Sequence, residues 1–430
     1  MITEGFLKLI DRGHIIPWEN LSEDQRIKIK ENPSHYFLPW DVSFKQGSTS
    51  TPCRCVFDGS SRTPGGTSLN EILAKGNADL ASLLEMVLAW VIGPVACCSD
   101  ISQFYNSVLL DDKHWPYQQV IWFNNLDTTS KLHRGIIRTC IYGITCVGAQ
   151  TEYVMNLIAD EVEDHHPEVA KLLRRRRYVD DFGTSCSTEN EIKHLIHNTE
   201  TTLNEKKMSV KGWAVSGNAP PEKLSENNIT VPFAGLQWLP EVDAYKLNIS
   251  SLHFGKKKRG RLPDDLIKYE GTFGKTIDDF TPQNLSRRMC SSVTARKYDI
   301  LGKAAPLDLR LKNDLRKLIL VDNDWDKPIS KELRSKWVEN FTILEDIRDI
   351  IYVRSSIPDD ALRTSVRLWL LCDGAEDGMM ITCHLGHERK NGLWSCHHLI
   401  AKNLLPPTGW SIPQIELHVL NALSNLAAFL

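Results

Sequence analysis

The sequence lacks any run of about eighteen apolar residues, the length that a membrane-spanning helix requires. Its first five residues also lack the basic start and apolar stretch that are typical of a secretory signal. We therefore expect no membrane partner. The eleven cysteines are scattered and show no disulfide framework, which favours a reducing compartment.

An excess of positive charge is also missing, because the formal net charge is -3 at pH 7. The chain as a whole therefore exerts no general attraction on nucleic acid, and such binding would depend on local basic clusters. Three clusters are present, at 174–177, 256–261 and 287–288. Each is equally compatible with a solvated surface, and the cluster at 256–261 also resembles a nuclear-localisation patch.

A phosphate-binding P-loop is absent, because the glycine-rich and serine-rich segment 58–70 has no lysine at the required spacing. What is present is the composition of an ordinary folded chain, with 42% hydrophobic and 24% charged residues. At 430 residues the chain is too long for one compact domain. We expect roughly two to four domains.

The most informative stretch is 177–183, where Asp180 and Asp181 follow an aromatic residue and precede a phenylalanine and a glycine. This pattern predicts a tight β-hairpin with both acids at its turn. Adjacent like charges raise each other's pKa, and a divalent metal ion removes that cost. A lone pair of this kind is more often an acidic surface turn, so the interpretation needs support from elsewhere in the chain.

A third carboxylate, Asp100, gives that support, because the apolar run 95–99 predicts a buried strand that ends at this acid. Three carboxylates can hold two magnesium ions in the arrangement used for in-line phosphoryl transfer. Successive strand residues point to opposite faces, so Asp180 and Asp181 cannot contribute equally. We expect Asp100 and Asp180 to be the main metal ligands and Asp181 to be auxiliary.

These residues resemble two motifs of reverse transcriptases. The segment 178–181, Tyr-Val-Asp-Asp, is similar to motif C, and 100–105, Asp-Ile-Ser-Gln-Phe-Tyr, is similar to motif A. From about residue 36 to the C-terminus, the sequence resembles the BEL/Pao class of long-terminal-repeat retrotransposons. The resemblance implies an RNA-directed DNA polymerase, which is a nucleotidyltransferase. Polyproteins of this class also carry an aspartic peptidase, but no Asp-Thr-Gly or Asp-Ser-Gly occurs here, so we expect no peptidase activity.

The fold that the resemblance implies is α+β, with the right-hand polymerase architecture of fingers, palm and thumb. It predicts N-terminal helices and fingers in 1–92, an antiparallel palm sheet in 93–250, a helical thumb and connection in 251–360, and a truncated ribonuclease H-like α/β unit in 361–430.

Two runs, 36–42 and 53–58, predict a hairpin that would lie in the fingers. By resemblance, Arg54 binds the triphosphate of the incoming nucleotide, a task that suits a planar guanidinium. Tyr105 matches the aromatic gate that collides with a ribose 2′-hydroxyl, and Tyr178 belongs to the substrate-binding Tyr-Val-Asp-Asp box. Apart from the resemblance, Arg54 would more often be a surface residue and Tyr105 a core residue.

Motif B is matched at 141–145, where Gly143 would permit close approach to the nucleotide. The chain then departs from the pattern. Where the family usually has Ser-Pro before the following helix, this sequence has Val147 and Gly148. We expect this difference to alter the geometry of the nucleotide pocket and, with it, the activity.

Lys211 is the expected motif D lysine, a general acid toward the pyrophosphate leaving group, although Lys206 and Lys207 compete for the match. The segment 233–238 resembles the primer grip, a hairpin that steers the primer 3′ end toward the metal ions. A plain hairpin with core aromatic residues is compatible with that role. The predicted members of the primer grip are Gly235, Leu236 and Trp238.

Near the C-terminus, Asp373 ends an apolar run and Glu416 opens a helical segment. Both resemble acids of a ribonuclease H domain, which needs more acids than these two, so we treat them as vestigial and expect no ribonuclease H activity. An unfinished sheet would leave an open edge, and we expect the last sixty or so residues to be less ordered than the palm.

A zinc site is the alternative for one C-terminal cluster, but its spacing fits no common structural pattern, and we consider zinc unlikely as a cofactor. The cluster consists of Cys383, His384, His387, Cys396, His397 and His398.

Three functions follow from these patterns. The first is a retrotransposon reverse transcriptase with two Mg²⁺ ions, acting on an RNA template, a DNA or RNA primer and dNTPs beside other parts of the polyprotein. It would work in a cytoplasmic retrotransposon particle or in the nucleus. The second is a catalytically decayed or co-opted fragment that binds nucleic acid or a partner. The third, an RNA-templated RNA polymerase, is disfavoured by Tyr105.

Overall fold

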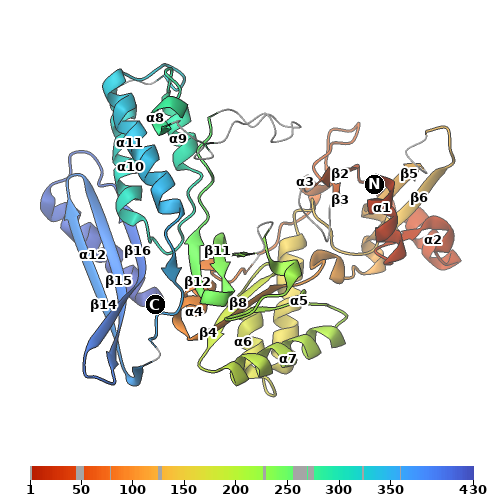
Figure 1. Cartoon of the computed structure of the whole chain (residues 1–430). Coiled ribbons are helices and arrows are strands. Elements are labelled where there is room, and N and C mark those ends of the chain that lie inside the picture. Colours follow the sequence, from red (N-terminus) through yellow and green to blue (C-terminus); the bar gives the residue numbers. More distant parts are fainter. Residues whose placement is uncertain are drawn as a thin grey trace.

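A computed structural model describes residues 2–44, 53–77, 79–123, 128–225, 229–254, 269, 276–321, 324–358 and 360–430. Over these ranges the chain mixes helices with antiparallel sheets (Figure 1). No helix within the described ranges is long and apolar enough to cross a membrane. The basic cluster at 256–261 lies outside the described residues.

The N-terminal part combines a small sheet, in the order β1-β6-β5, with a separate β2-β3 hairpin and short helices. Its elements are α1 (Ile2–Asp11), β1 (Ile15–Pro17), α2 (Glu23–Glu31), β2 (Trp40–Phe44), β3 (Cys53–Phe57), α3 (Leu69–Ile72), β5 (Gln119–Phe123) and β6 (Leu132–Ile137). The predicted hairpin is confirmed, because β2 pairs antiparallel with β3 from Trp40 opposite Phe57 to Phe44 opposite Cys53.

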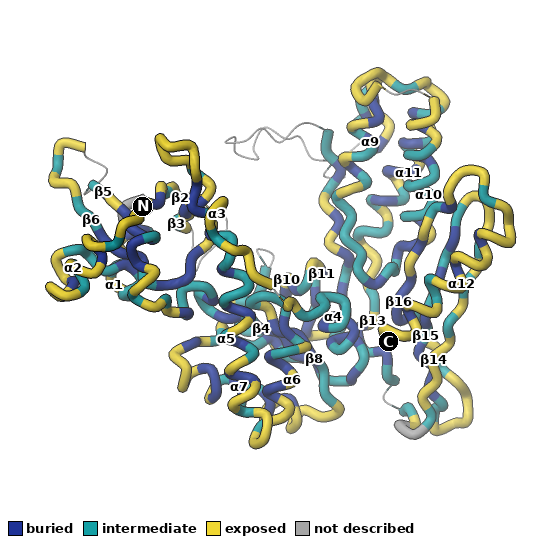
Figure 2. The backbone as a smooth tube through the Cα atoms, turned by 180° about the vertical axis from the view of Figure 1, so that it is seen from behind, coloured by how far each residue is buried: buried dark blue, intermediate teal, exposed yellow. Residues whose placement is uncertain are grey.

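The central sheet has the strand order β7-β8-β4-β9, and its pairs are antiparallel. Its strands are β4 (Val95–Asp100), β7 (Arg177–Tyr178), β8 (Asp181–Cys186) and β9 (Ala214–Val215). The apolar run before Asp100 forms the predicted strand, and β4 is largely buried along its length (Figure 2). This strand therefore delivers Asp100 at the end of a buried segment.

Two hydrophobic cores lie on opposite faces of this sheet. Phe182 belongs to a core with residues of the helices around β8, including Leu195 and Leu203. Ala96 and Cys98 belong to a second core with Trp90 and its neighbours. The surrounding helices are α4 (Leu83–Ile92), α5 (Val147–Val162), α6 (Pro167–Arg175) and α7 (Glu189–Glu205). The cores hold β4 and β8 in a fixed register beneath the carboxylates.

A second sheet, in the order β10-β11-β12-β13, packs beside the first. Its strands are β10 (Val231–Phe233), β11 (Leu236–Leu239), β12 (Ala244–Leu247) and β13 (Tyr352–Val353). The turn between β10 and β11 consists of Ala234 and Gly235, both with positive φ (47° and 77°), as a two-residue hairpin of type I′ requires. The sheet joins residues near 240 to residues near 352.

The C-terminal part contains a helical group and a three-stranded sheet in the order β14-β15-β16 (Figure 1). Its elements are α8 (Ile277–Phe280), α9 (Arg287–Thr294), α10 (Ala305–Val321), α11 (Lys331–Arg348), β14 (Ala361–Ala375), β15 (Gly378–Arg389), β16 (Trp394–Leu404) and α12 (Ile412–Phe429). α12 packs on β14 and β15, and α10 contacts β16. β14 is an edge strand, as expected for an unfinished sheet.

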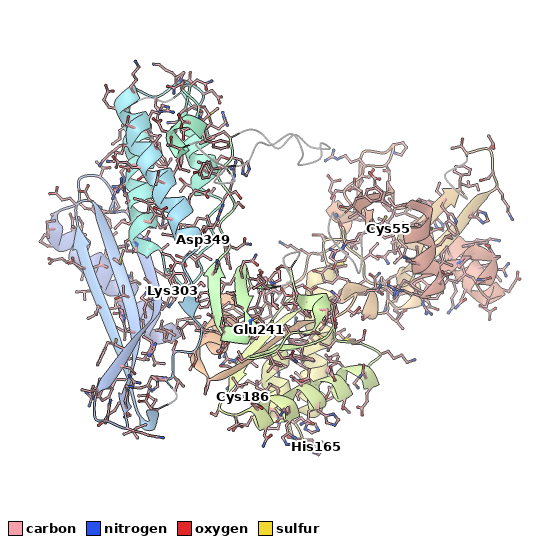
Figure 3. The ribbon with its side chains drawn as sticks, in the orientation of Figure 1. Cys55, His165, Cys186, Glu241, Lys303 and Asp349 are labelled. Atoms are coloured by element: carbon pink, nitrogen blue, oxygen red, sulfur yellow. The ribbon has the colours of Figure 1, made fainter. Side chains whose placement is uncertain are left out.

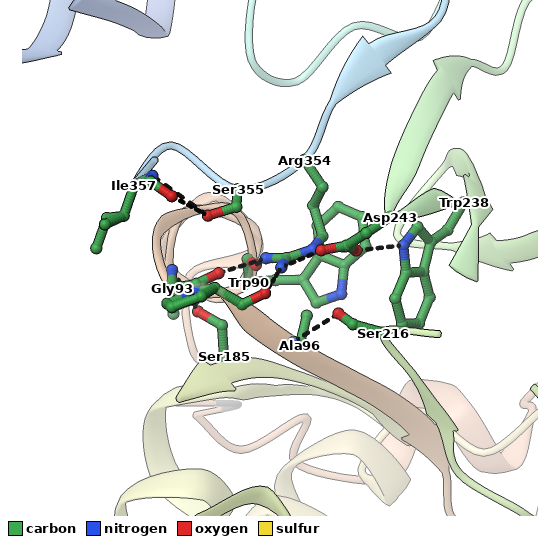
Figure 4. A network of polar contacts seen from close by, with 12 residues as sticks. Trp90, Gly93, Ala96, Ser185, Ser216, Trp238, Asp243, Arg354, Ser355 and Ile357 are labelled. Carbon is green, nitrogen blue, oxygen red and sulfur yellow. Dashed lines mark hydrogen bonds and ion pairs between the residues drawn. The ribbon is translucent and has the colours of Figure 1, made fainter. Parts of the chain in front are cut away.

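Arg354 connects this C-terminal part to the central region (Figure 4). Its guanidinium group is fully buried and donates to both carboxylate oxygens of Asp243, at 2.6 Å each. It also donates to the carbonyl oxygens of Trp90, Gly93 and Pro94. One side chain thus joins the end of α4, the turn before β12 and the chain that leaves β13.

Candidate active site

Three carboxylates predicted from the sequence meet where β4 and the β7–β8 hairpin end. The strand register places Asp181 directly opposite Asp100, so both side chains emerge on the same face of the sheet. Asp180 lies in the hairpin turn, and its carbonyl oxygen accepts a hydrogen bond from the Ile101 N–H at 2.9 Å. The structure thus brings all three acids together, with Asp181 as the cross-strand neighbour of Asp100.

The three acids differ in their electrostatic surroundings. Burial raises the pKa of Asp181 to about 6, and the charges of Asp180 and Asp100 add to that shift. Burial also raises the pKa of Asp180, helped by Asp100 and opposed by Lys211 and Arg54. Two of the acids therefore carry charge against the preference of their surroundings, as expected where like charges gather without a cation.

Two lysines surround the third acid. The ammonium group of Lys211 contacts Oδ2 of Asp100, and that of Lys223 contacts Oδ1. Burial of Asp100 acts to raise its pKa, but the two ammonium groups outweigh burial and lower it. Lys211 was predicted from the sequence. Lys223 was missed, since it follows two prolines in a loop with no motif around it.

The hairpin turn is held by a buried ion pair. Arg177 and Glu152, with side chains 1% and 5% exposed, form two parallel hydrogen bonds of 2.8 and 2.7 Å. Arg177 also donates to the carbonyl of Val179, which has a positive φ of 57° within the turn. A left-handed valine is unfavourable, so this bond to its carbonyl helps to fix the turn that carries Asp180. The sequence alone did not reveal Glu152 as a partner.

Tyrosines and an arginine lie around Asp180. The rings of Tyr105 and Tyr142 are 4.6 Å apart between centroids. The pKa of Tyr142 is raised by burial first and then by Asp180, while Arg54 opposes the rise. Arg54, on β3, is therefore within electrostatic reach of the acids although it is distant in sequence. Tyr142 is a site candidate that the sequence analysis did not single out.

The motif B segment connects the site to the N-terminal hairpin. Gly143 has φ +101°, and a Cβ there would lie 1.9 Å from the carbonyl oxygen of Phe57. The predicted close approach exists, but its neighbour is the β3 backbone. A Cβ on Gly148 would meet nothing within 4 Å, whereas Val147 is buried at the start of α5. The departure from the family pattern thus leaves open space at Gly148.

The β10–β11 hairpin, predicted as the primer grip, lies against strand β8, which begins at Asp181, and against Tyr298. Leu236 and Trp238 are fully buried in the core, whereas Pro232 on β10 and Gly235 at the tip are exposed. A Cβ on Gly183 would lie 2.0 Å from the Phe233 ring, which shows how closely β8 approaches β10. At the tip, the Gly235 backbone lies against Tyr298.

The predicted basic clusters are largely used within the chain. Arg174 pairs with Asp160 and Glu163, and Arg177 with Glu152. Arg288 forms two hydrogen bonds with Asp326, at 2.7 and 3.0 Å, and Arg287 is buried over the ring of Trp325. Acidic side chains from other segments balance the charge of Arg174, Arg177 and Arg288, and the core covers Arg287; nucleic-acid binding by these two clusters stays a prediction.

The two acids of the predicted ribonuclease H unit do not converge. A Cβ on Gly374 would contact Ile415 and Val419 of α12. Since neighbouring strand residues point to opposite faces, the exposed Asp373 points away from α12, which carries Glu416. The two carboxylates therefore lie on different sides of the sheet.

The histidines and cysteines near the C-terminus divide between environments. His384 lies opposite His398 in the strand register, with ring centroids 5.4 Å apart, while Cys383 is buried and Cys396 is exposed. Lys303, where the helices meet the sheet, donates to the carbonyl of His398 (Figure 3). Burial lowers the pKa of His398 to about 4, and Lys303 adds to the shift.

The donor set of the carboxylate cluster suits magnesium, which prefers carboxylate oxygens. Burial is the main cause of the raised pKa values of Asp180 and Asp181, and the positive charge of Lys211 opposes the rise at both acids. As arranged, however, no group of three or more His, Cys, Asp or Glu side chains in the described ranges could hold a metal ion. Both carboxylate oxygens of Asp100 are already in contact with the ammonium groups of Lys211 and Lys223.

The fold resembles that of solved structures of a retroviral protease-reverse transcriptase. One similar structure is the foamy viral protease-reverse transcriptase in complex with an RNA/DNA hybrid, with a TM-score of 0.51 and 11% identity over 98% of this chain. Another is the same protein, described as dRH, in complex with double-stranded DNA, with a TM-score of 0.53, 11% identity and 98% coverage. This chain spans 45% and 59% of those chains, and at this identity the likeness concerns the fold alone.

One family model matches the C-terminal third of the chain. Residues 286–430 match the family described as the Pao retrotransposon-like RNaseH-like domain. The predicted resemblance to Pao retrotransposons is thereby confirmed. The match begins at residue 286, ahead of the predicted boundary at 361, so it includes the helices α9 to α11. A comparison with curated proteins finds no match.

Proposed function

We propose that this chain is an RNA-directed DNA polymerase of a Pao-type retrotransposon, which adds dNTPs to a primer 3′-hydroxyl. The observation that carries the proposal is the meeting of Asp100, Asp180 and Asp181 where β4 and the β7–β8 hairpin end. Three carboxylates at adjoining strand ends are the donor set that metal-assisted nucleotidyl transfer needs. The reverse transcriptase fold supports the same reaction class.

In this proposal the parts of the chain take the roles of a right hand. The central sheet with Asp100 is the palm, the β2–β3 hairpin with Arg54 belongs to the fingers, and the helices α8 to α11 form thumb and connection. An RNA template, paired with a DNA or RNA primer, would lie across the palm. Other parts of the polyprotein are proposed partners, and a cytoplasmic particle or the nucleus is the proposed location.

Each side chain then has a physical task. Arg54 offers a planar fork to the triphosphate from a position that already interacts with Asp180. Tyr105, supported by the ring of Tyr142, would stand beneath the sugar and exclude a 2′-hydroxyl. Lys211 is a proton donor for the pyrophosphate only after its ammonium group leaves Asp100.

Asp100, Asp180 and Asp181 would hold two Mg²⁺ ions. Bound there, these ions would acidify the primer 3′-hydroxyl and neutralise charge on the leaving pyrophosphate. The buried Arg177–Glu152 pair would keep the turn, and with it Asp180, in place during this chemistry.

The test is primer extension on an RNA template with dNTPs and Mg²⁺. We expect the wild-type chain to extend the primer and Asp180→Asn to lose at least about a hundredfold in rate, as for loss of an essential electrostatic group. The matched control is Asp164→Asn, an exposed acid after α5, which should extend at the wild-type rate. Equal extension by wild type and Asp180→Asn would refute the proposal.

A second candidate is a decayed or co-opted fragment that binds nucleic acid without catalysis. Two observations favour it: both oxygens of Asp100 are bound by lysines, and Val147 and Gly148 replace the usual motif B residues. If no variant extends a primer while wild type and Asp180→Asn bind an RNA/DNA hybrid equally, this second function is the correct one.

A further inference from the structure

Lys223 is a largely buried cation at the carboxylate cluster, and it is the last residue of a short 3₁₀ turn, Pro221–Lys223. Its side chain is only 11% exposed, and its ammonium group contacts Oδ1 of Asp100. Lys211, which contacts Oδ2 of the same acid, is 42% exposed and comes from the segment beside β4. Burying the ammonium group of a lysine costs free energy because the group loses its hydration. The contact with the Asp100 carboxylate offsets that cost and so stabilises Lys223 in this position.

The loop around Lys223 restricts where the ammonium group can go. Pro220 and Pro221 precede it, and proline fixes the backbone angle φ. A Cβ on Gly212 would lie 2.5 Å from Glu222 and 3.0 Å from Pro220, so the loop packs directly on the backbone next to Lys211. Beyond Lys223, Leu224 packs against the core.

The far end of the loop is attached to the hairpin β10–β11. The Ser225 N–H donates to the carbonyl of Thr230 at 2.6 Å, and the Thr230 hydroxyl donates to Gln237 Oε1 at 2.9 Å. The placement of Lys223 is therefore built into the fold and is not that of a freely rotating surface lysine.

We propose that Lys223 is the resident cation of this site, occupying the position on Asp100 that a divalent metal ion would take, and that metal binding requires its ammonium group to leave. This inference rests on the proposed function only in treating the cluster as a metal site. With both oxygens of Asp100 bound by ammonium groups, a metal ion meets two positive charges and one fewer free ligand.

The test measures Mn²⁺ binding by electron paramagnetic resonance, with no nucleic acid present. Removing one competing unit charge should tighten binding, so Lys223→Met should lower the Mn²⁺ dissociation constant by roughly tenfold. Lys223→Arg keeps the charge and should bind Mn²⁺ as wild type does. Lys193→Met, which removes an exposed lysine paired with Glu189, is the matched control and should change nothing.

Two results would overturn the inference. One is Mn²⁺ binding by Lys223→Met that is equal to or weaker than that of wild type, which would make Lys223 a support for Asp100. The other is no Mn²⁺ binding to any variant at millimolar concentration, which would mean that the cluster binds no metal ion even when Lys223 is absent. Circular dichroism verifies the fold, and Lys223→Gln takes the place of Lys223→Met if the latter is unfolded.

Failure of this inference and failure of the proposed function give different results. Primer extension by wild type together with unchanged Mn²⁺ affinity in Lys223→Met refutes the inference alone. Tighter Mn²⁺ binding in Lys223→Met without primer extension by any variant supports the inference and refutes the polymerase.

Discussion

The three acids of the site share one cluster but not one electrostatic environment. Asp100 has a lowered pKa because two ammonium groups face it, whereas burial and neighbouring carboxylates raise the pKa values of Asp180 and Asp181. The ionised carboxylates of Asp180 and Asp181 therefore destabilise the folded chain. Perturbed pKa values of this kind are common at functional sites.

Replacing Asp181 by asparagine should stabilise the metal-free protein at neutral pH. The pKa of Asp181 rises from 3.8 to about 6 on folding, so its favourable contribution is fully present below pH 3.8 and is lost as the pH rises through 6. Each pKa unit corresponds to about 1.4 kcal/mol. Asp181 keeps access to solvent although the surrounding residues partly desolvate its carboxyl group, so solvent screening reduces the expected gain to roughly 1 kcal/mol.

The measurement is thermal unfolding in EDTA from pH 4 to pH 8. The melting temperature of Asp181→Asn should match that of wild type near pH 4 and exceed it above pH 6. Asp164→Asn, outside the cluster, should follow wild type throughout. A difference for Asp181→Asn that does not change with pH would contradict the proposed origin of the shift.

At the scale of elements, α5 connects the site to the rest of the central region. Its N-cap, Cys146, makes no side-chain capping bond, and Val147 and Gly148 form its first turn. Further along the same helix, Glu152 forms the buried pair with Arg177. The helix therefore has a weak start and a strong attachment to the hairpin.

Gly148→Ala should raise the free energy of unfolding by about 0.5–1 kcal/mol, because alanine favours helix and the new Cβ meets nothing within 4 Å. Gly143→Ala is the matched contrast. Its Cβ would overlap the Phe57 carbonyl, and its φ is +101°, so it should lose more than about 2 kcal/mol. Urea denaturation compares the two. Equal effects of the two substitutions would contradict the described surroundings of Gly143 and Gly148.

Arg177→Met should destabilise the chain by about 3–5 kcal/mol, because it leaves the Glu152 carboxylate buried without a partner. The double variant Arg177→Met with Glu152→Leu removes both charges and should lose clearly less. Urea unfolding of wild type, the single variants and the double variant forms a complete cycle. Arg175→Met, at an exposed neighbouring position, should stay within about 0.5 kcal/mol of wild type. Additive losses in the double variant would count against a coupled pair.

At the scale of the molecule, Arg354 joins parts of the chain that lie far apart in sequence. It binds Asp243 and the carbonyl oxygens at the end of α4, and it directly precedes the C-terminal unit with β14 to β16 (Figure 4). Few other contacts in this region combine full burial with so many hydrogen bonds. The attachment of the C-terminal unit should therefore be sensitive to this single side chain.

Arg354→Leu should cost about 3–5 kcal/mol, because it breaks a buried ion pair and leaves backbone carbonyl groups without donors. Differential scanning calorimetry should show the loss as a lower transition temperature, with the C-terminal unit unfolding separately. Arg367→Leu, an exposed arginine on β14, should cost less than about 1 kcal/mol. An unchanged single transition for Arg354→Leu would show that other contacts carry the attachment.

The sequence by itself determined the local elements of the site. An apolar run that ends in Asp100 predicts β4, and two acids beside aromatic residues predict the β7–β8 turn, because burial and turn chemistry act over a few residues. The β2–β3 hairpin with Arg54 followed from the same kind of local pattern. The resemblance then indicated that these elements belong together.

Only the tertiary structure decided which distant charges meet. The attachment of Lys223 to Asp100, of Glu152 to Arg177 and of Asp243 to Arg354 depends on contacts between segments separated by 25 to 123 positions. The contact between Glu152 and Arg177 also balances one charge of the basic run 174–177. Charge pairing across a fold is set by how the chain packs. The residues next to an arginine in sequence do not show whether it will lie at the surface or be buried against a distant acid, so no local pattern encodes the pairing.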